Sequence, residues 1–403
     1  MGTRMTLPRK AARETYDALL RLLPTGGVPT ETQALIKRTY LIRHGQCEVV
    51  APDPLAGDFD SAADGLRLTP GSDFWPHKPA TDFVIEGSAF AGGRAISMRV
   101  VSVRIAAVVK RVAVFGRRAI RRRPDGSVRI DEPDPFLEVP LTFTNAYGGL
   151  DGRIPFDVGH YGFVLEDSVL AGDHPGLYPR NPYGKAYFVG SIPDTTDLEM
   201  PSLEDPEDLL TEERLILNDP GRWYEQPLPW CLHWMSLRMF PRCAHFFGTD
   251  AWFPGPEDER MPEVRRGFLP SGFRTALQHE IGPAIAQEAS CGLVLPALAG
   301  GEPVVLEGMH PEEPVIRFSL PPLPRVQFVL EGRRQFAIPR MHTILVKPAE
   351  HKLSITYAAE AELHRAFVPG IHARIPVSVS VDGDTAIAYP TPPTHRALAK
   401  RTS

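Results

Sequence analysis

The first part of the chain contains short apolar runs in which β-branched residues recur and turn residues intervene. Val84, Val100 and Val112 lie in three such runs, and β-branched side chains pack well on a pleated, partly buried strand. The pair Gly92-Gly93 interrupts the runs where we expect a hairpin turn. The pattern predicts strands at about 35–43, 82–90, 96–106, 108–115, 126–130 and 136–143, a spacing typical of antiparallel sandwiches.

Short apolar runs return after Leu293 and continue almost to the end of the chain. The dipeptide Asp382-Gly383 follows the last of them and is typical of a tight hairpin turn. A second group of strands is therefore predicted at about 302–308, 314–320, 325–330, 334–338, 342–347, 352–358 and 373–380.

Two further segments have a different pattern. In residues 10–24 the apolar side chains of Tyr16, Leu20 and Leu23 recur at a spacing that favours one face of a helix, which Pro24 ends. Between 144 and 290 regular alternation is lost, and apolar residues recur in a way that indicates helical segments near 205–217, 228–239 and 273–290.

Together these patterns predict a mainly β fold, in which antiparallel β-sandwich layers carry a loop-rich, partly helical insert and a short N-terminal helix. The expected organisation is an N-terminal helix and linker at 1–34, a β-sandwich region at 35–145, a loop- and helix-rich insert at 146–292, a C-terminal β region that packs with the first at 293–390, and a tail at 391–403.

Composition supports a loop-rich globular protein. Proline is unusually frequent, with 42 in 403 residues, and proline suits strand ends and connecting loops rather than helix interiors. The four cysteines are widely scattered, which favours reduced thiols and a cytoplasmic location. No apolar stretch is long enough for a signal sequence or a membrane span, so no membrane partner is expected.

Charge is unevenly distributed along a chain whose formal net charge is −5. The stretch from Arg99 to Arg123 has basic residues and no acidic one, whereas Glu199 to Arg214 is strongly acidic. Such asymmetry can steer a protein of opposite charge, although charge runs more often mark only exposure. Because the chain as a whole is acidic, no nucleic-acid partner is expected. The candidate partner-binding residues are Arg117, Arg118, Arg121, Arg122 and Arg123, together with the aromatic residues Trp252 and Phe253.

An Arg43-His44-Gly45 sequence follows the first predicted strand and resembles the phosphohistidine signature of histidine phosphatases. In those enzymes the histidine attacks phosphorus and the arginine holds the oxygens. That chemistry needs a second histidine and an acid on later parallel strands with helices between them, and this sequence predicts consecutive β runs instead. A phosphatase-like hydrolase using His44 remains an alternative interpretation.

A metal-dependent hydrolase is a second form of the same alternative. Cys231 and His233 are followed closely by Cys243 and His245, and tetrahedral zinc accepts thiolate and imidazole ligands. The usual zinc spacings are of the Cys-x-x-Cys type, so buried structural cysteines are the favoured interpretation. We therefore expect no metal, no cofactor and no catalytic residue, and the protein is predicted not to be an enzyme.

Several longer blocks occur along the chain and carry a family resemblance. They are Lys78-Pro-Ala-Thr-Asp82, Pro140-Leu-Thr-Phe-Thr-Asn-Ala-Tyr-Gly-Gly149, Asn181-Pro-Tyr-Gly-Lys185, Leu198 to Pro206, Phe240-Pro-Arg242 with Gly248 to Trp252, and Gly301-Glu-Pro-Val-Val-Leu-Glu-Gly-Met-His-Pro311 followed by Phe318 to Pro321. In this order they resemble a bacterial domain of unknown function whose members accompany type VI secretion systems.

The resemblance implies a cytoplasmic, non-enzymatic adaptor or chaperone. Its partners would be a toxic effector protein and a spike protein of the VgrG type, onto which the adaptor loads the effector. A structural component that travels with the spike is a further alternative. Loss of binding after surface mutation would favour the adaptor, and loss of turnover after His44→Ala would favour the hydrolase.

Overall fold

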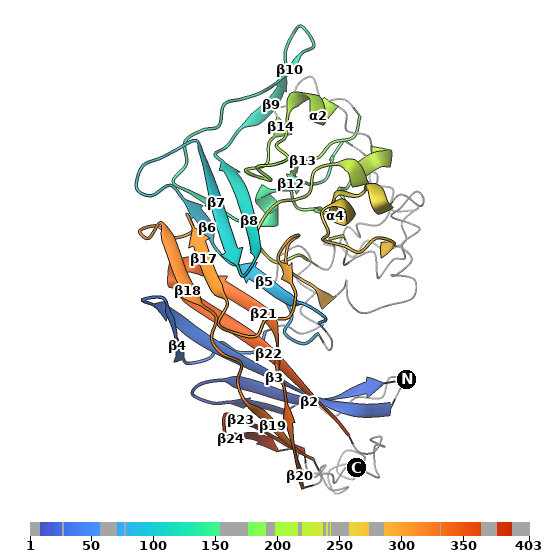
Figure 1. Cartoon of the computed structure of the whole chain (residues 1–403). Coiled ribbons are helices and arrows are strands. Elements are labelled where there is room, and N and C mark those ends of the chain that lie inside the picture. The colour runs from blue at the N-terminus through green and yellow to red at the C-terminus, as the bar shows by residue number, and fades with distance from the viewer. Residues whose placement is uncertain are drawn as a thin grey trace, which may run out of the picture.

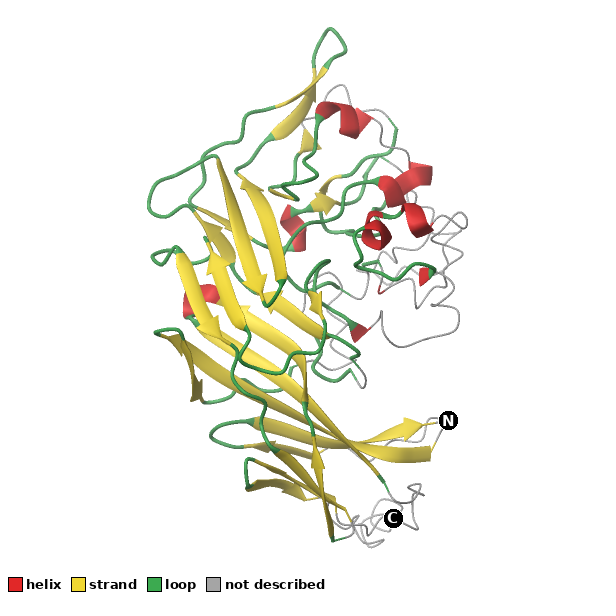
Figure 2. Cartoon of the chain, viewed as in Figure 1, coloured by secondary structure: helices red, strands yellow, loops and turns green. Residues whose placement is uncertain are grey.

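The computed structural model describes residues 9–25, 28–56, 71–75, 78–153, 176–190, 198–216, 220–236, 239–240, 242, 258–273, 286–330, 332–363 and 377–388. Strands dominate these residues, and the mainly β fold class predicted from the sequence is confirmed (Figure 2). No helix in the described part of the chain is long and apolar enough to cross a membrane.

The largest sheet has eight strands and is built from both ends of the chain (Figure 1). The central pairing is antiparallel between β3 and β22, whereas β5 lies parallel to β21. Its strands, in order across the sheet, are β1 (Arg9–Ala12), β2 (Asp17–Thr25), β3 (Val28–Arg43), β22 (Lys352–Glu362), β21 (Arg340–Lys347), β5 (Thr81–Ile85) and β16 (Val294–Leu295), with β4 (Gln46–Val50) paired to β3.

The predicted N-terminal helix is wrong, because residues 9–25 form strands β1 and β2. Strand β2 is covered on both faces: Ala18 and Leu20 enter the main core, while Leu19 packs with Leu35 in a small separate cluster. A strand buried on both faces has apolar residues at consecutive positions, so its sequence lacks the alternation that distinguishes a strand from a helix. Pairing with β3 decided the structure.

A second sheet has five strands and continues the β assembly. Its order is β15 (Leu203–Glu204), β8 (Val108–Phe115), β7 (Met98–Ile105), β17 (Pro303–Glu307) and β18 (Val315–Ser319). The hairpin turn between β7 and β8 lies at Ala106, which has a φ of 50°. The hairpin expected at Gly92-Gly93 is not formed, because β6 (Ser88–Phe90) before it pairs with β11 (Glu138–Pro140) and not with β7.

A third sheet of four strands lies at one end of the molecule (Figure 1). Its order is β20 (Arg333–Ala337), β19 (Val326–Leu330), β23 (Val377–Val381) and β24 (Asp384–Ala388). The predicted turn at Asp382-Gly383 is confirmed: it joins β23 to β24, and both residues have positive φ angles of 51° and 95°. One continuous hydrophobic core contacts all three sheets, through residues such as Ile36, Val103 and Phe328.

The middle of the chain forms a separate lobe with its own aromatic core. It contains α2 (Glu212–Ile216), α4 (Pro262–Arg265), η3 (Pro220–Glu225) and η4 (Asp258–Arg260), the short strand pair β12 (Tyr147–Gly148) and β13 (Lys185–Ala186), and a three-stranded sheet of β10 (Val128–Ile130), β9 (Ala119–Arg122) and β14 (Leu198–Glu199). Two further short helical turns are η2 (Phe143–Asn145) and η5 (Pro348–Glu350).

The helix predictions in the middle region are only partly correct. A short helix, α2, lies within 205–217, but the described residues of 228–239 contain no helix, and most of 273–290 lies outside the described residues. In the 228–239 segment the backbone of Leu232 bonds to Ile85 and Leu141 on neighbouring segments. Leu228, Trp230 and Trp234 are buried in the main core, so apolar residues without alternation mark burial on all sides and not a helix.

Candidate functional site

The predicted arginine surface lies on the β9–β10 hairpin, which projects at the end of the molecule opposite the four-stranded sheet (Figure 1). We call residues 117–132 the arginine hairpin. Arg117, Arg121 and Arg123 are exposed, and Arg122 is half-buried. The hairpin register places Arg121 directly opposite Arg129, an exposed arginine that the sequence analysis missed because the basic run was counted only to Arg123.

A hollow of about 280 Å³ lies against this hairpin. It is lined by four arginines and two acidic residues: Arg121, Arg122, Arg123, Arg129, Asp131 and Glu132, with Pro124. The Nε of Arg121 lies 3.1 Å from a carboxylate oxygen of Asp131, and the two side chains are 56% and 37% exposed. Because exposed ion pairs are weak, the hairpin keeps a positive surface around the hollow.

Arg118 differs from its neighbours because its side chain is buried. It forms an ion pair with Glu204, donates to the carbonyl oxygen of Pro201 at 3.1 Å, and its guanidinium lies 3.8 Å from the ring centroid of Phe115. Burial lowers the pKa of Arg118 and raises that of Glu204. The structure therefore places Arg118 inside the fold, where it cannot belong to an exposed binding patch.

The predicted aromatic contacts Trp252 and Phe253 lie outside the described residues. The described aromatic residues that precede them are buried. Trp223 and Phe240 meet edge to face with ring centroids 5.7 Å apart, and Phe240 meets Phe273 in the same way at 5.8 Å. These aromatic residues build the core of the middle lobe, which is the more common role of clustered aromatic side chains.

The Lys78-to-Asp82 block forms a buried ion network. The Nζ of Lys78 donates to Asp82 at 2.7 Å, to Glu288 at 3.1 Å and to the hydroxyl of Thr343 at 3.0 Å. All of these side chains are buried. Burial alone would lower the pKa of Lys78, but the carboxylates of Asp82 and Glu288 raise it above its usual value, so the side chain stays charged.

Glu288 and Asp82 extend this network to three separate segments. Glu288 also accepts from the indole N–H of Trp75 and from Arg242, each at 3.1 Å. Asp82 accepts from the backbone N–H groups of Glu288 at 2.9 Å and Ala289 at 3.1 Å. Every charge is thus paired, a condition that a buried ionic cluster must meet to persist. The network joins β5 to the segments around 75, 242 and 288.

The Asn181-to-Lys185 block has the same kind of role in the middle lobe. Asn181 donates from its side-chain amide to the carbonyl oxygens of Phe143 at 2.8 Å and Tyr147 at 3.0 Å. A Cβ atom on Gly148 would lie 2.2 Å from the carbonyl oxygen of Asn181, so the close approach of the two blocks requires glycine there. These two sequence blocks pack against each other.

Arg180, directly before this block, is completely buried and forms an ion pair with Glu263. It also donates to the backbone carbonyl oxygens of Trp223 at 3.0 Å and Tyr224 at 2.6 Å. One guanidinium therefore holds η3 and α4 together. Its donors are used inside the protein, so they are not available to a ligand.

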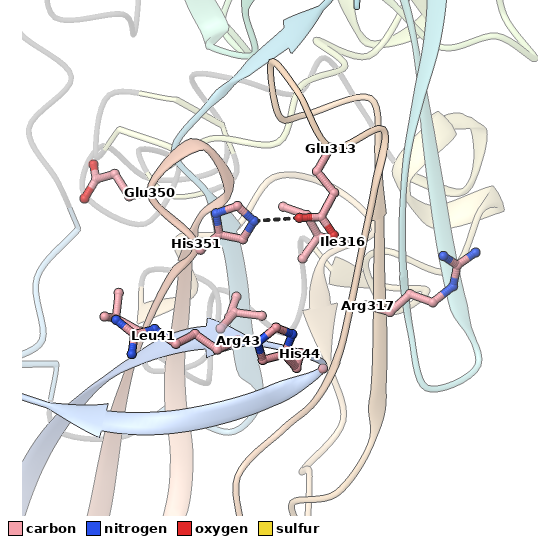
Figure 3. A pocket seen from close by; sticks show the side chains of 10 residues that line it. Leu41, Arg43, His44, Glu313, Ile316, Arg317, Glu350 and His351 are labelled. Atoms are coloured by element: carbon pink, nitrogen blue, oxygen red, sulfur yellow. Dashed lines mark hydrogen bonds and ion pairs between the residues drawn. The ribbon is translucent and has the colours of Figure 1, made fainter.

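His44 lies beside a larger hollow of about 550 Å³ (Figure 3). The hollow is lined by the β3–β4 turn, part of β18 and the turn after η5, through Leu41, Ile42, Arg43, His44, Gly45, Glu313, Ile316, Arg317, Glu350 and His351. His44 and Gly45 form the two-residue turn between β3 and β4, with φ angles of 50° and 78°. His44 is thus at an antiparallel hairpin tip, and β4, not a helix, follows it.

The sequence pattern does not single out two further histidines here: His351 lines the hollow, and His310 packs against His351. His351 has its Nε2 2.8 Å from a carboxylate oxygen of Glu313, as the dashed line in Figure 3 marks. The rings of His351 and His310 have centroids 4.4 Å apart. His310 is the second-last residue of the Gly301-to-Pro311 block, and its Nδ1 accepts the backbone N–H of Glu313 at 2.9 Å.

Partial burial, together with the nearby His351 ring, lowers the pKa of His310. A neutral His310 keeps the Nδ1 lone pair that its backbone contacts require. Among the described residues that line the hollow, none is Ser, Thr, Cys or Lys. The arrangement offers imidazole, carboxylate and guanidinium groups at an open surface, and His310 uses its own ring to shape the turn.

Of the predicted cysteine–histidine set, only Cys231 and His233 are described, and Cys243 and His245 lie outside the described residues. Burial raises the pKa of the Cys231 thiol to about 12 and lowers the pKa of His233. Both side chains are therefore neutral near pH 7. Within the described ranges no group of three or more His, Cys, Asp or Glu side chains is placed to hold a metal ion.

Residues 30–358 match the model of a bacterial family described as "uncharacterized protein conserved in bacteria" (DUF2169). The match covers most of the chain, including each of the sequence blocks in the ion networks above. No curated protein and no solved structure matches the chain.

Proposed function

We propose that this chain, which belongs to the uncharacterized bacterial family DUF2169, is a non-enzymatic adaptor of type VI secretion. In this proposal the protein binds a toxic effector in the cytoplasm and places it on a spike protein of the VgrG type. The link to secretion comes from the resemblance of the sequence blocks. The arginine hairpin would contact an acidic surface of the effector or of the spike.

The positions of the block side chains in the fold support a binding role. Lys78, Asp82 and Asn181 lie in the blocks, and each uses its side chain to brace the interior. The proposal therefore places partner recognition at exposed positions outside these three residues. The exposed surface offers shape and charge, which are the means by which an adaptor recognises its partner.

The single observation that carries the proposal is the pairing of Arg121 with Arg129. Like charges directly opposite each other in a strand pair destabilise the pair. Asp131 offsets part of this repulsion through its contact with Arg121. An acidic partner would offset the remainder, so the hairpin gains more from binding than a neutral hairpin would, and its charge would also accelerate encounter.

The first test is the gene's neighbourhood, where an adaptor should lie between genes for a spike protein and a toxin. The purified neighbouring effector and spike are then captured separately by the full-length protein. The test variant is Arg121→Gln/Arg123→Gln/Arg129→Gln, and the matched control Arg94→Gln/Arg104→Gln/Arg317→Gln removes the same charge from exposed sites elsewhere.

We expect the hairpin variant to associate on the order of tenfold more slowly at low salt, with a weaker salt dependence, and the control to change little. Equal on-rates and salt slopes for the two variants would contradict a role for the hairpin. If neither neighbour binds the wild-type protein, the adaptor proposal fails. Recovery of the protein itself among the secreted proteins would favour a structural spike component.

A further inference from the structure

Strand β20 carries the two most exposed large hydrophobic side chains among the described residues. Phe336 is 76% exposed and Ile338, just after the strand, is 86% exposed. Successive strand residues point to opposite faces, so Arg334, Phe336 and Ile338 lie on one face. We call these three residues the β20 strip. Large hydrophobic side chains are seldom this exposed at the edge of a sheet.

The strip runs along an edge that the described part of the chain leaves open. β20 is the first strand of its sheet and pairs only with β19 among the described strands; β22 comes near it without pairing. In an antiparallel strand about half of the backbone N–H and C=O groups point away from the neighbouring strand. These groups, beside Phe336 and Ile338, form a template for one more strand.

The rest of this face shows that the hydrophobic character belongs to the edge. Gln327 lies opposite Phe336 on β19, and Ser380 lies opposite Gln327 on β23. The buried side chains Val326 and Phe328 point to the other face, into the main core. The sheet therefore does not need Phe336 for its own packing, and only a strand added at the edge would cover both the strip and the open backbone groups.

Charge indicates what kind of strand fits. Arg333 and Arg334 on β20 are exposed. Arg340, which follows shortly after, already forms an ion pair with Glu360 at 3.3 Å. The sequences of residues 364–376 and 389–403 contain arginine or lysine and no aspartate or glutamate, so charge disfavours both as the added strand. An acidic segment with hydrophobic residues at alternate positions would match the strip and its arginines.

We propose that β20 binds an extended, acidic segment of a partner protein by strand addition. In this arrangement Phe336 and Ile338 pack between alternate side chains of the partner segment. This site lies at the end of the molecule opposite the arginine hairpin (Figure 1). The inference goes beyond the loading function and does not rest on it, because it can be tested with this protein alone. Two separate sites would allow one chain to hold two partners.

The test selects short random peptides displayed on phage against the full-length protein, and the enriched peptides are then synthesised. Amide hydrogen exchange is measured with and without the peptide, since backbone pairing protects amides of β20 and side-chain docking alone does not. The variant Phe336→Ser/Ile338→Ser removes the strip, and the control Leu137→Ser removes a hydrophobic side chain that is 62% exposed elsewhere.

We expect the enriched peptides to alternate acidic and hydrophobic residues and to slow amide exchange at residues 333–338. We expect their affinity for the strip variant to be at least tenfold lower than their affinity for the Leu137→Ser control. Because Phe336 and Ile338 are highly exposed, the variant should unfold at the same urea concentration as the wild type. Peptides that bind the strip variant unchanged, or that leave exchange at 333–338 unchanged, would overturn the inference. Self-association of the wild-type protein that is lost in the strip variant would also overturn it, because the occupant would then be a second copy of the chain. Faster amide exchange at β20 after removal of residues 389–403 would do the same, because the occupant would then be the chain's own C-terminal segment.

Discussion

The Lys78 network and the arginine hairpin use the same kinds of side chain for opposite purposes. Lys78 lies among Asp82 and Glu288 with every charge paired and water excluded. Arg121 and Arg129 lie opposite each other on exposed strands, and Arg121 contacts the carboxylate of Asp131. The difference teaches that burial, and not residue type, separates the charges that hold this fold from those available to a partner.

The largest expected effect is the loss of stability when the buried Lys78 network loses its lysine. Lys78→Ala removes the cation that Asp82 and Glu288 share and leaves Glu288 with Arg242, which should lower the free energy of unfolding by about 3–5 kcal/mol. Urea denaturation measures the loss. The control Lys185→Ala breaks a partly exposed pair with Glu199 and should cost at most about 1 kcal/mol. Similar losses in the two variants would show that the network is not a stabilising unit.

Stability should also depend on pH through the same network. Burial alone would raise the pKa of Glu288, but Lys78 and Arg242 lower it below its usual value. A carboxyl with a lowered pKa in the folded state stabilises the fold above its unfolded-state pKa, which for glutamate is about 4.3, and that stability is lost as the pH falls below it. We therefore expect the wild-type urea midpoint to fall between about pH 5 and pH 3.

The Lys78→Ala variant should weaken this dependence. Without the ammonium, Glu288 keeps Arg242 but loses one of the two cations that oppose the effect of burial on its pKa, so protonation costs the variant less stability as the pH falls. Urea midpoints of both proteins across this range provide the measurement. Parallel curves for the two proteins would assign the acid sensitivity to other carboxylates.

A smaller effect is expected on the exposed side of the comparison. Arg121→Gln/Arg129→Gln removes the cross-strand repulsion and also the Arg121–Asp131 contact, so the free energy of unfolding should change by no more than about 0.5 kcal/mol. Thermal unfolding is the readout. A large destabilisation would place the hairpin arginines with the structural charges, and their partner-binding role would lose its basis.

The smallest effect is expected at His44, which belongs to neither group. As a non-glycine residue with a φ of 50° in a tight turn, it is replaceable by glycine without strain. His44→Gly should change the free energy of unfolding by less than about 0.3 kcal/mol, because the relief of the left-handed backbone is offset by the greater freedom of glycine in the unfolded chain. Phosphate release from a generic phosphomonoester, measured for wild type and His44→Ala, tests the hydrolase alternative. Turnover that the substitution abolishes would restore that alternative.

Several features could be predicted from the sequence because their causes are local. The hairpin at Asp382-Gly383 depends on two adjacent residues that adopt positive φ angles, and most strands depend on β-branched runs between turns. The strand at Asp17–Thr25 was missed because burial on both faces removed its alternation. The segment around Trp230 also lacks alternation because it is buried on all sides, so its sequence favours a helix that the described residues do not form.

The candidate site was harder to predict than the fold. Arg118 and Arg121 are three positions apart in one basic run, yet Arg118 points to Glu204 in the interior while Arg121 lies in solvent. Arg129 joined the surface only through its register with Arg121. Likewise, nothing in the residues around Phe336 indicates that β20 ends a sheet with its outer edge open among the described strands.

The amino-acid sequence by itself determined the mainly β class and the places of most strands, because a side-chain period of two and the turn residues act over a few positions. The tertiary structure alone decided which charges are paired. Lys78 meets Glu288 across 210 residues and Thr343 across 265, and strands from the two ends of the chain share one sheet. Burial and partner choice arise from packing between distant segments, and a local pattern does not contain that information.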